Sequence, residues 1–230
     1  MALPKERSKI VRDLSSQVIL VYGRAKIGKS TLCSKFESPL FLATEPGLNH
    51  LEVFKVNITS WVKFLEACSD IAKGGHEFKT IVLDTIDNLV VYCSDWVCKE
   101  NGINHPSELP HGKGWSLVTS ELNRALVKLG SLPYGLIMVS HCDLTEVETK
   151  TRKYSRWTIS VSGKNRNVFL NMTDLILFVD SEVASDGSEK RLIRTKPSMN
   201  YEAGDRSNLL PESLPLDYDE LAKYFKKEDK

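Results

Sequence analysis

The residues with the clearest chemistry form one short loop, Gly23-Arg-Ala-Lys-Ile-Gly-Lys-Ser30. This spacing is the Walker A pattern, in which glycines let successive backbone N–H groups point at phosphate oxygens. Lys29 is expected to reach the β- and γ-phosphates of ATP, and the Ser30 hydroxyl to ligate Mg²⁺. The loop therefore predicts a nucleotide site whose cofactors are ATP and Mg²⁺. Its predicted binding residues are Gly23, Arg24, Ala25, Lys26, Ile27, Gly28, Lys29, Ser30 and Thr31.

A second motif, Ile81-Val-Leu-Asp84, matches the Walker B pattern of an apolar strand that ends in a carboxylate. Asp84 is then expected to hold Mg²⁺ through water. A strand-end aspartate also caps helices, so the functional interpretation depends on the loop upstream. Thr85 follows in place of a glutamate. The base that activates water must therefore lie elsewhere in the chain.

Two further side chains at the ends of predicted strands are candidates for catalysis. Glu45 follows the apolar run 39–44, which we expect to neighbour the strand before the loop. Because ligands bind at the carboxyl ends of strands in open α/β sheets, Glu45 is the candidate base and His141 a candidate sensor of the γ-phosphate. The alternatives are a solvated turn carboxylate beside Pro46 and a strand-end histidine without a catalytic role.

These side chains require a sheet with helices on its faces to position them. Buried strands are predicted at 17–22, 39–44, 80–83 and 135–140, and helices at 29–36, 60–73, 86–99 and 115–129. This alternation predicts an α/β fold with a mainly parallel sheet, extended by antiparallel C-terminal strands at 175–179 and 192–195. The predicted organisation is an N-terminal arm (1–16), one ATPase domain (17–216) and a C-terminal helix and tail (217–230).

The overall composition is that of an ordinary globular protein. The 230 residues are 41% hydrophobic and 27% charged, with a net charge of +1, so any site for a polyanion must be a local patch. The five cysteines show no C-x-x-C spacing, which indicates thiols in a reducing compartment. The start lacks a signal peptide and no apolar run reaches ~18 residues, so we expect a cytoplasmic protein without a membrane partner.

One segment after the fourth strand combines cations with aromatic side chains. Residues 147–161 alternate loosely between polar and apolar, as in an exposed hairpin. Cations follow a phosphate backbone while aromatic rings stack on bases, so this segment is a candidate for binding single-stranded DNA. A solvated basic face is the alternative. The candidate residues are Lys150, Arg152, Lys153, Tyr154, Arg156, Trp157, Lys164 and Arg166.

The order of these motifs resembles the RecA-like ATPase core, a P-loop NTPase fold. Four segments carry a narrower similarity to phage-encoded RecA-like nucleotide-binding proteins of single-strand annealing recombination. They are 19–36, TIVLDTIDNL at 80–89, HGKGW at 111–115 and YEAGDR at 201–206. The resemblance covers residues 17–216. It implies an ATPase that binds single-stranded DNA and, if phage-encoded, lies in the host cytoplasm.

The resemblance also implies roles for particular residues. Glu45 falls where RecA-like proteins have the general base. His141 stands where they usually have a glutamine that couples the γ-phosphate to the DNA loop, and this departure leaves the coupling open. Arg194 and Lys196 match a pair of cations that reach the phosphates of a neighbouring subunit, with a solvated strand face as the alternative. The implied assembly is a homo-oligomer, either a ring or a filament.

These observations favour an ATPase that acts on single-stranded DNA in phage recombination or replication, with a single-strand-binding protein as a candidate partner. Two other classes stay open. One is a nucleotide-dependent switch that binds a protein partner with little turnover. The other is a small-molecule P-loop kinase, for which no lid-like arginine cluster follows residue 140.

Overall fold

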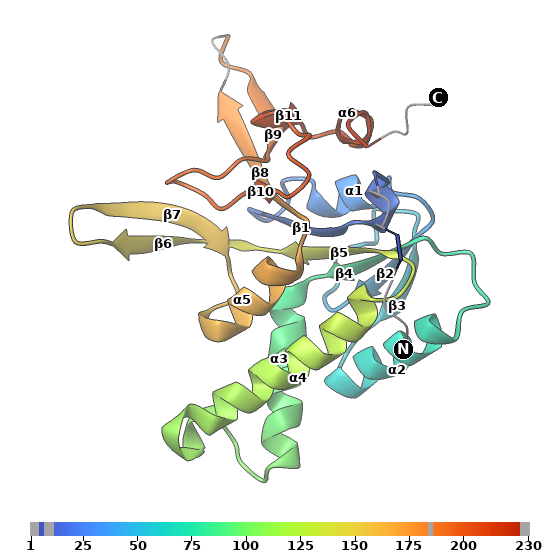
Figure 1. Ribbon diagram of the computed structural model, residues 1–230, viewed down its shortest axis with the longest axis vertical. Coiled ribbons are helices and arrows are strands. Elements are labelled where there is room, and N and C mark those ends of the chain that lie inside the picture. The colour runs from blue at the N-terminus through green and yellow to red at the C-terminus, as the bar shows by residue number, and fades with distance from the viewer. Residues whose placement is uncertain (1–4, 7–11, 184–185, 226–230) are drawn as a thin grey trace.

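The predicted apolar runs form neighbouring strands of one sheet in a computed structural model that describes residues 5–6, 12–183 and 186–225 (Figure 1). Within these residues the sheet has nine strands, in the order β11-β9-β8-β1-β5-β4-β2-β3, with β10 paired to β8. The strands are β1 (Val18–Gly23), β2 (Pro39–Ala43), β3 (Phe54–Asn57), β4 (Thr80–Asp84), β5 (Gly135–Ser140), β8 (Leu175–Val183), β9 (Glu189–Arg194), β10 (Gly204–Asp205) and β11 (Ser213–Pro215).

In the order of the sheet, neighbouring strands pair in parallel along β3, β2, β4, β5, β1 and β8. The strands β9, β10 and β11 pair antiparallel. The predicted fold class, α/β with a mainly parallel sheet and antiparallel C-terminal strands, is therefore confirmed. One expectation about strand order is wrong. β2 does not neighbour β1, because β4 and β5 lie between them. The apolar runs alone predict that these strands share a sheet, but their order depends on how the connecting helices cross it.

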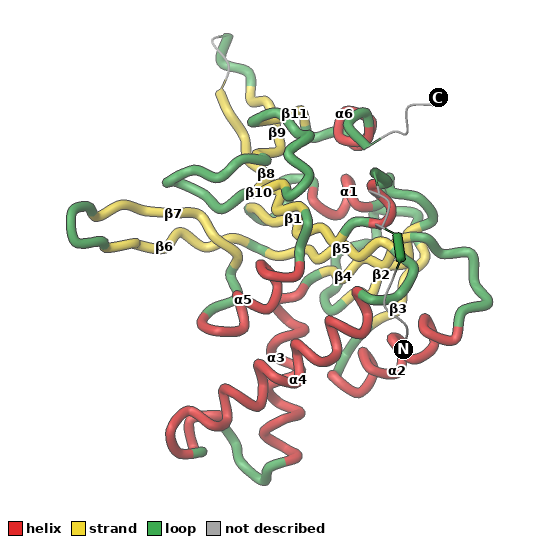
Figure 2. The backbone as a smooth tube through the Cα atoms, in the orientation of Figure 1, coloured by secondary structure: helices red, strands yellow, loops and turns green. Residues whose placement is uncertain are grey.

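Helices cover both faces of the sheet (Figure 2). They are α1 (Lys29–Cys33), α2 (Trp61–Lys73), α3 (Ile86–Glu100), α4 (Lys113–Gly130), α5 (Gly163–Met172) and α6 (Tyr218–Ala222), with short 3₁₀ turns η1 (Leu14–Ser16), η2 (Pro106–Glu108) and η3 (Pro110–Gly112). The predicted N-terminal arm falls mostly outside the described residues, but Leu14 at its end is buried. In the described part of the chain, no helix combines the length and hydrophobicity needed to cross a membrane.

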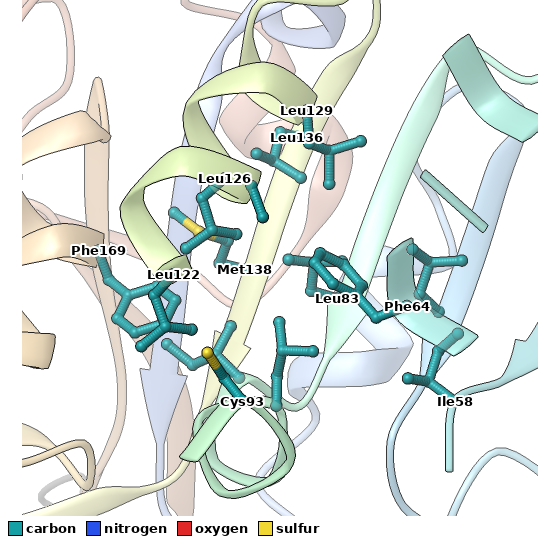
Figure 3. Packing of buried hydrophobic residues seen from close by; sticks show 14 of the residues in the cluster. Ile58, Phe64, Leu83, Cys93, Leu122, Leu126, Leu129, Leu136, Met138 and Phe169 are labelled. Carbon is teal, nitrogen blue, oxygen red and sulfur yellow. The ribbon is translucent and has the colours of Figure 1, made fainter. Parts of the chain in front are cut away.

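Alternating strand residues divide the core into two layers. On β1, Leu20 and Tyr22 face α2–α5, whereas Ile19 and Val21 face α1 and α6. Figure 3 shows part of the first layer, in which leucines of α4 pack against Phe169 of α5 and Met138 of β5. This alternation follows from the period of two in a strand, with both faces of a parallel sheet buried.

Two elements escape prediction from the sequence because they bury little apolar surface. All four residues of β3 are exposed at the sheet edge. The buried residues of α5 are only Asn165 and Phe169, too few to give a helical period. The predicted hairpin is confirmed and is longer than expected. Its strands β6 (Cys142–Glu148) and β7 (Lys153–Ile159) form a separate two-stranded sheet that projects from the end of β5 (Figure 1).

The hairpin is joined to the central strand through Tyr22, which immediately precedes the glycine loop. The buried Tyr22 hydroxyl donates to the Glu202 carbonyl at 2.5 Å and accepts from the Glu202 N–H at 2.9 Å. The Trp157 carbonyl of β7 lies 3.3 Å from the same hydroxyl. Burial raises the pKa of Tyr22 above its ordinary value, so the hydroxyl stays protonated.

Tyr22→Phe is expected to lower the free energy of unfolding by about 1–2 kcal/mol, because it removes the hydrogen bonds between a buried hydroxyl and the Glu202 backbone. Urea denaturation measures the change. Tyr134→Phe is a matched control, since the Tyr134 hydroxyl makes no hydrogen bond to the described residues. Equal losses in the two variants would contradict the structural role of Tyr22.

Candidate functional site

The glycine loop links the end of β1 to the start of α1. Gly28 caps the helix with a φ of 113°, in the left-handed region that favours glycine. Lys29 follows at the first helical position and is 6% exposed. Its Nζ donates to the carbonyl oxygens of Gly23 at 2.7 Å and Arg24 at 2.8 Å. The ammonium is therefore held across the loop, where phosphate oxygens would meet it.

Ser30 and Asp84 face each other beside this lysine. The Ser30 hydroxyl donates to Asp84 Oδ2 at 2.7 Å. Asp84 is 5% exposed, and burial raises the pKa of its carboxyl, while burial lowers the pKa of Lys29. A carboxylate and a hydroxyl oxygen are ligands that Mg²⁺ accepts in nucleotide sites, where the phosphates complete the coordination. These two residues fit such an ion, because a cation here would offset the burial of the carboxylate.

Glu45 and His141 meet at the same edge of the sheet. Glu45 follows β2 and His141 follows β5, and His141 Nε2 lies 3.4 Å from Glu45 Oε1. Their side chains are 34% and 37% exposed, so water reaches both. Glu45 lies here although its strand is separated from β1 by two others. A carboxylate next to an imidazole, open to water, has the composition of a site that orients an attacking water.

Asp87, which the sequence reasoning passed over, connects this edge to the hairpin. It lies in the first turn of α3, and its carboxylate accepts from the Ser140 hydroxyl at 3.1 Å and from the His141 N–H at 3.3 Å. The Ser160 hydroxyl, just after β7, also donates to it. The available signal was a second carboxylate in the first turn of the helix that follows the strand ending in Asp84.

One pocket of about 610 Å³ is lined by Lys29, Ser30, Glu45, Asp84 and His141. Its lining also includes His50, Thr85 and Arg191, which the sequence reasoning did not single out as site residues. No local motif marks His50 or Arg191, whereas Thr85 directly follows Asp84 at the end of β4. The complete lining is Ala25, Lys26, Gly28, Lys29, Ser30, Thr31, Glu45, Pro46, Gly47, Leu48, His50, Asp84, Thr85, His141 and Arg191.

The remaining residues of the predicted loop lie next to this lining. Gly23 supplies a carbonyl to Lys29, and Ile27 is buried in the core layer under α1. Arg24 turns away from the loop, and its Nη2 donates to the Ser181 hydroxyl of β8 at 2.8 Å.

Arg194 and Lys196, the predicted cation pair, lie outside this lining. Arg194 forms ion pairs with Glu182 and with Asp180, the latter at 3.7 Å. Lys196 lies 3.5 Å from the carboxylate of Asp205. Both cations are therefore partnered within the chain. Their contact with the phosphates of a neighbouring subunit stays a prediction.

The predicted DNA-binding residues divide into two groups. Lys150, Arg152 and Lys164 are exposed and form no ion pair with a described residue. The other side chains are engaged. Lys153 pairs with Glu146 at 2.8 Å, Arg156 and Arg166 approach Glu202, the Arg156 guanidinium lies 6.0 Å from the Tyr154 ring centre, and Trp157 packs against the core. Lys164 and Arg166 lie on α5, so the cations do not share one loop.

The fold and this site define a P-loop NTPase: a phosphate loop after a central parallel strand, with a carboxylate at a nearby strand end. The chain belongs to the AAA domain family, whose model matches residues 15–207. The SPbeta prophage-derived uncharacterized protein YorG of Bacillus subtilis (strain 168) is 26% identical over 140 residues, which cover 58% of this chain and 43% of that protein. The match therefore spans less than half the length of this relative.

Among solved structures, the KaiC-like protein PH0186 from the archaeon Pyrococcus horikoshii OT3 is similar with a TM-score of 0.44 and 13% identity. The alignment covers 78% of each chain.

Asp84→Asn is expected to abolish Mg²⁺-dependent stabilisation by ATP without destabilising the protein alone. A raised pKa means that folding disfavours the ionised carboxylate, so Asp84 reduces stability at neutral pH and this effect disappears as pH falls below the ordinary pKa. Wild type should gain about 2.7 kcal/mol at ATP concentrations a hundredfold above Kd. Thermal unfolding with and without Mg²⁺–ATP measures both effects, and exposed Asp95→Asn is the control. Retained Mg²⁺-dependent stabilisation in Asp84→Asn would contradict this role.

Proposed function

We propose that this chain is an ATPase that binds ATP with Mg²⁺ and hydrolyses it. The observation that carries the proposal is the pairing of Glu45 with His141 at 3.4 Å, in the pocket that also holds Lys29, Ser30 and Asp84. A pocket that only bound nucleotide would need the loop and the metal ligands. The additional carboxylate, open to water, supplies what hydrolysis needs.

In the proposed mechanism, each side chain of the pocket has its own role. Lys29 offsets negative charge on the β- and γ-phosphates. Part of this charge develops as the bond to the leaving oxygen lengthens. Glu45 accepts a hydrogen bond from the attacking water and orients it toward the γ-phosphorus. His141 holds the Glu45 carboxylate from the side of β5. Ser30 and Asp84 would hold Mg²⁺, which would supply positive charge against the phosphates.

Glu45→Gln is expected to bind ATP with wild-type affinity and to lose about 10²–10⁴-fold in kcat. The amide keeps an oxygen for His141, so the pocket retains its shape, but it does not accept a proton from water. Isothermal titration with ATP and steady-state phosphate release give the two quantities. Glu52→Gln, an exposed glutamate outside the pocket lining, is the matched control.

Lys29→Ala should remove binding in the same assays. Loss of ATP affinity with unchanged kcat in Glu45→Gln would assign Glu45 a structural role, and an unchanged ATPase rate in Lys29→Ala would remove the ATPase proposal altogether.

We further propose that the substrate on which ATP hydrolysis acts is single-stranded DNA, in phage recombination or replication. Support comes from the unpaired cations Lys150, Arg152 and Lys164 on and beside the projecting hairpin, and from the prophage origin stated in the name of YorG. Asp87 accepts hydrogen bonds from the N–H of His141, which lines the nucleotide pocket, and from the Ser160 hydroxyl beside the hairpin base, so it connects the hairpin to the pocket. Tyr154 is a better stacking candidate than Trp157, because Trp157 packs against the core.

The double variant Lys150→Ala/Arg152→Ala is expected to bind single-stranded DNA more weakly and with less dependence on salt. Two lost phosphate contacts should flatten the log–log salt slope by about 1.4. Fluorescence anisotropy of a labelled oligonucleotide at several NaCl concentrations measures the slope. Lys99→Ala/Lys128→Ala, exposed cations on α3 and α4, is the matched control, and an unchanged slope in the hairpin variant would exclude these two contacts.

The same DNA separates the alternative functions. A recombination ATPase should hydrolyse ATP faster when DNA is added, whereas a protein-binding switch or a small-molecule kinase should not respond. We also propose a homo-oligomer, ring or filament, in which Arg194 and Lys196 reach a neighbour's phosphates. Arg194 would have to leave Asp180 and Glu182 to do so, so assembly would have to break these two ion pairs.

A further inference from the structure

Arg191 is a cation in the nucleotide pocket to which no motif assigns a role. It lies on β9, lines the pocket together with Lys29 and Thr31, and forms no ion pair or hydrogen bond through its side chain with any described residue. Its Nη1 would lie 3.7 Å from a Cβ placed on Gly28. A free guanidinium beside a phosphate loop has the chemistry to bind a phosphate oxygen.

The alternation of β9 explains why this arginine reaches the loop. Arg191 has the same parity as Ile193, which is buried in the core layer that contains α1. Arg194 has the opposite parity, and its guanidinium lies 5.8 Å from the ring centre of Tyr201, which packs on the other layer. Of these two arginines, Arg191 therefore faces the helix that carries the phosphate loop.

This part of β9 is connected to the loop on two sides. Arg191 pairs directly with Ser181 of β8, and the Ser181 hydroxyl accepts from Arg24 Nη2 at 2.8 Å. On the other side, the Arg191 carbonyl accepts from the Leu216 N–H at 3.2 Å, and Leu216 Cδ2 would lie 3.0 Å from a Cβ on Gly28. Two connections thus hold the Arg191 backbone against the loop.

The strand order indicates which part of the nucleotide Arg191 meets. Seen from β1, Glu45 and Asp84 come from β2 and β4 on one side of the sheet, and Arg191 comes from β9 on the other. The γ-phosphate is expected next to Glu45 and Asp84, where the metal ligands and the base lie. The other side of the loop then receives the α-phosphate and the nucleoside.

We propose that Arg191 binds the α-phosphate of the nucleotide held in its own subunit. This inference rests on the proposed ATP binding and deepens it. Because ATP, ADP and GTP share the α-phosphate, the contribution of Arg191 is the same for all three. It differs from the role predicted for Arg194, which concerns the γ-phosphate of a neighbouring subunit.

Arg191→Ala is expected to lower the affinities for ATP, ADP and GTP by the same factor, about tenfold or more for a charge-assisted contact. Isothermal titration of the full chain with each nucleotide measures the three factors. Arg191→Lys should retain part of the affinity, since it keeps the charge but loses the planar fork. Lys190→Ala, the adjacent exposed cation on the opposite face of β9, should bind as wild type does.

Three results would overturn the proposal: unchanged affinities in Arg191→Ala, a loss for ATP without a loss for ADP, or a loss that differs between ATP and GTP. The last two would mean contact with the γ-phosphate or with the base. Lys29→Ala in the same series separates this inference from the function on which it rests. If Lys29→Ala still binds ATP with wild-type affinity, the assignment of the nucleotide site is wrong. If only Arg191→Ala gives a result that contradicts the proposal, the assignment of the site stands. Thermal unfolding without nucleotide verifies that each variant is folded.

Discussion

Two opposite charges buried at one edge of the sheet constrain the whole site. Burial lowers the pKa of Lys29 and raises that of Asp84, so the protein environment disfavours the charged form of each. Each group therefore needs polar partners close by. Lys29 takes them from the carbonyls of the loop, and Asp84 from Ser30. The turns of the loop and the position of the first helical residues allow the Lys29 ammonium and the Asp84 carboxylate to make these hydrogen bonds. Burial of two such groups reduces stability, and such a cost is typical of a binding site.

The same edge is physically continuous with the projecting hairpin. Asp87 accepts hydrogen bonds from the end of β5 and from Ser160 beyond β7, and the Ser160 N–H donates to the His141 carbonyl at 3.1 Å. Tyr22 makes a second connection on the other side of β5, through Glu202. A shift of the hairpin base relative to the sheet would break bonds to a partly buried carboxylate and a buried hydroxyl. Movements of the hairpin and of His141 are therefore expected to be coupled in energy.

Much of this arrangement could be predicted from the sequence, because the predictable parts are local. The loop residues from Gly23 to Ser30 fix their own backbone, and apolar runs that end in Asp84 or Ser140 predict buried strands with polar side chains at one edge. Strand β3 and helix α5 could not be predicted, since exposed or sparsely buried segments have no clear period. The separation of β2 from β1 could not be predicted either, because the crossover connections set the strand order and the strand sequences carry no pattern for it.

The order of the motifs does not predict which arginine of β9 faces the phosphate loop. Arg191 and Arg194 lie three residues apart, so they occupy opposite faces of the strand, one toward α1 and one toward Tyr201. A resemblance based on the sequence of motifs assigns a cation to this strand but does not choose the face. That choice depends on the register with β8, where Ser181 opposes Arg191 and Phe178 opposes Arg194. The register also places Ser181 within reach of Arg24, so the phosphate loop is hydrogen-bonded to the strand that pairs with Arg191.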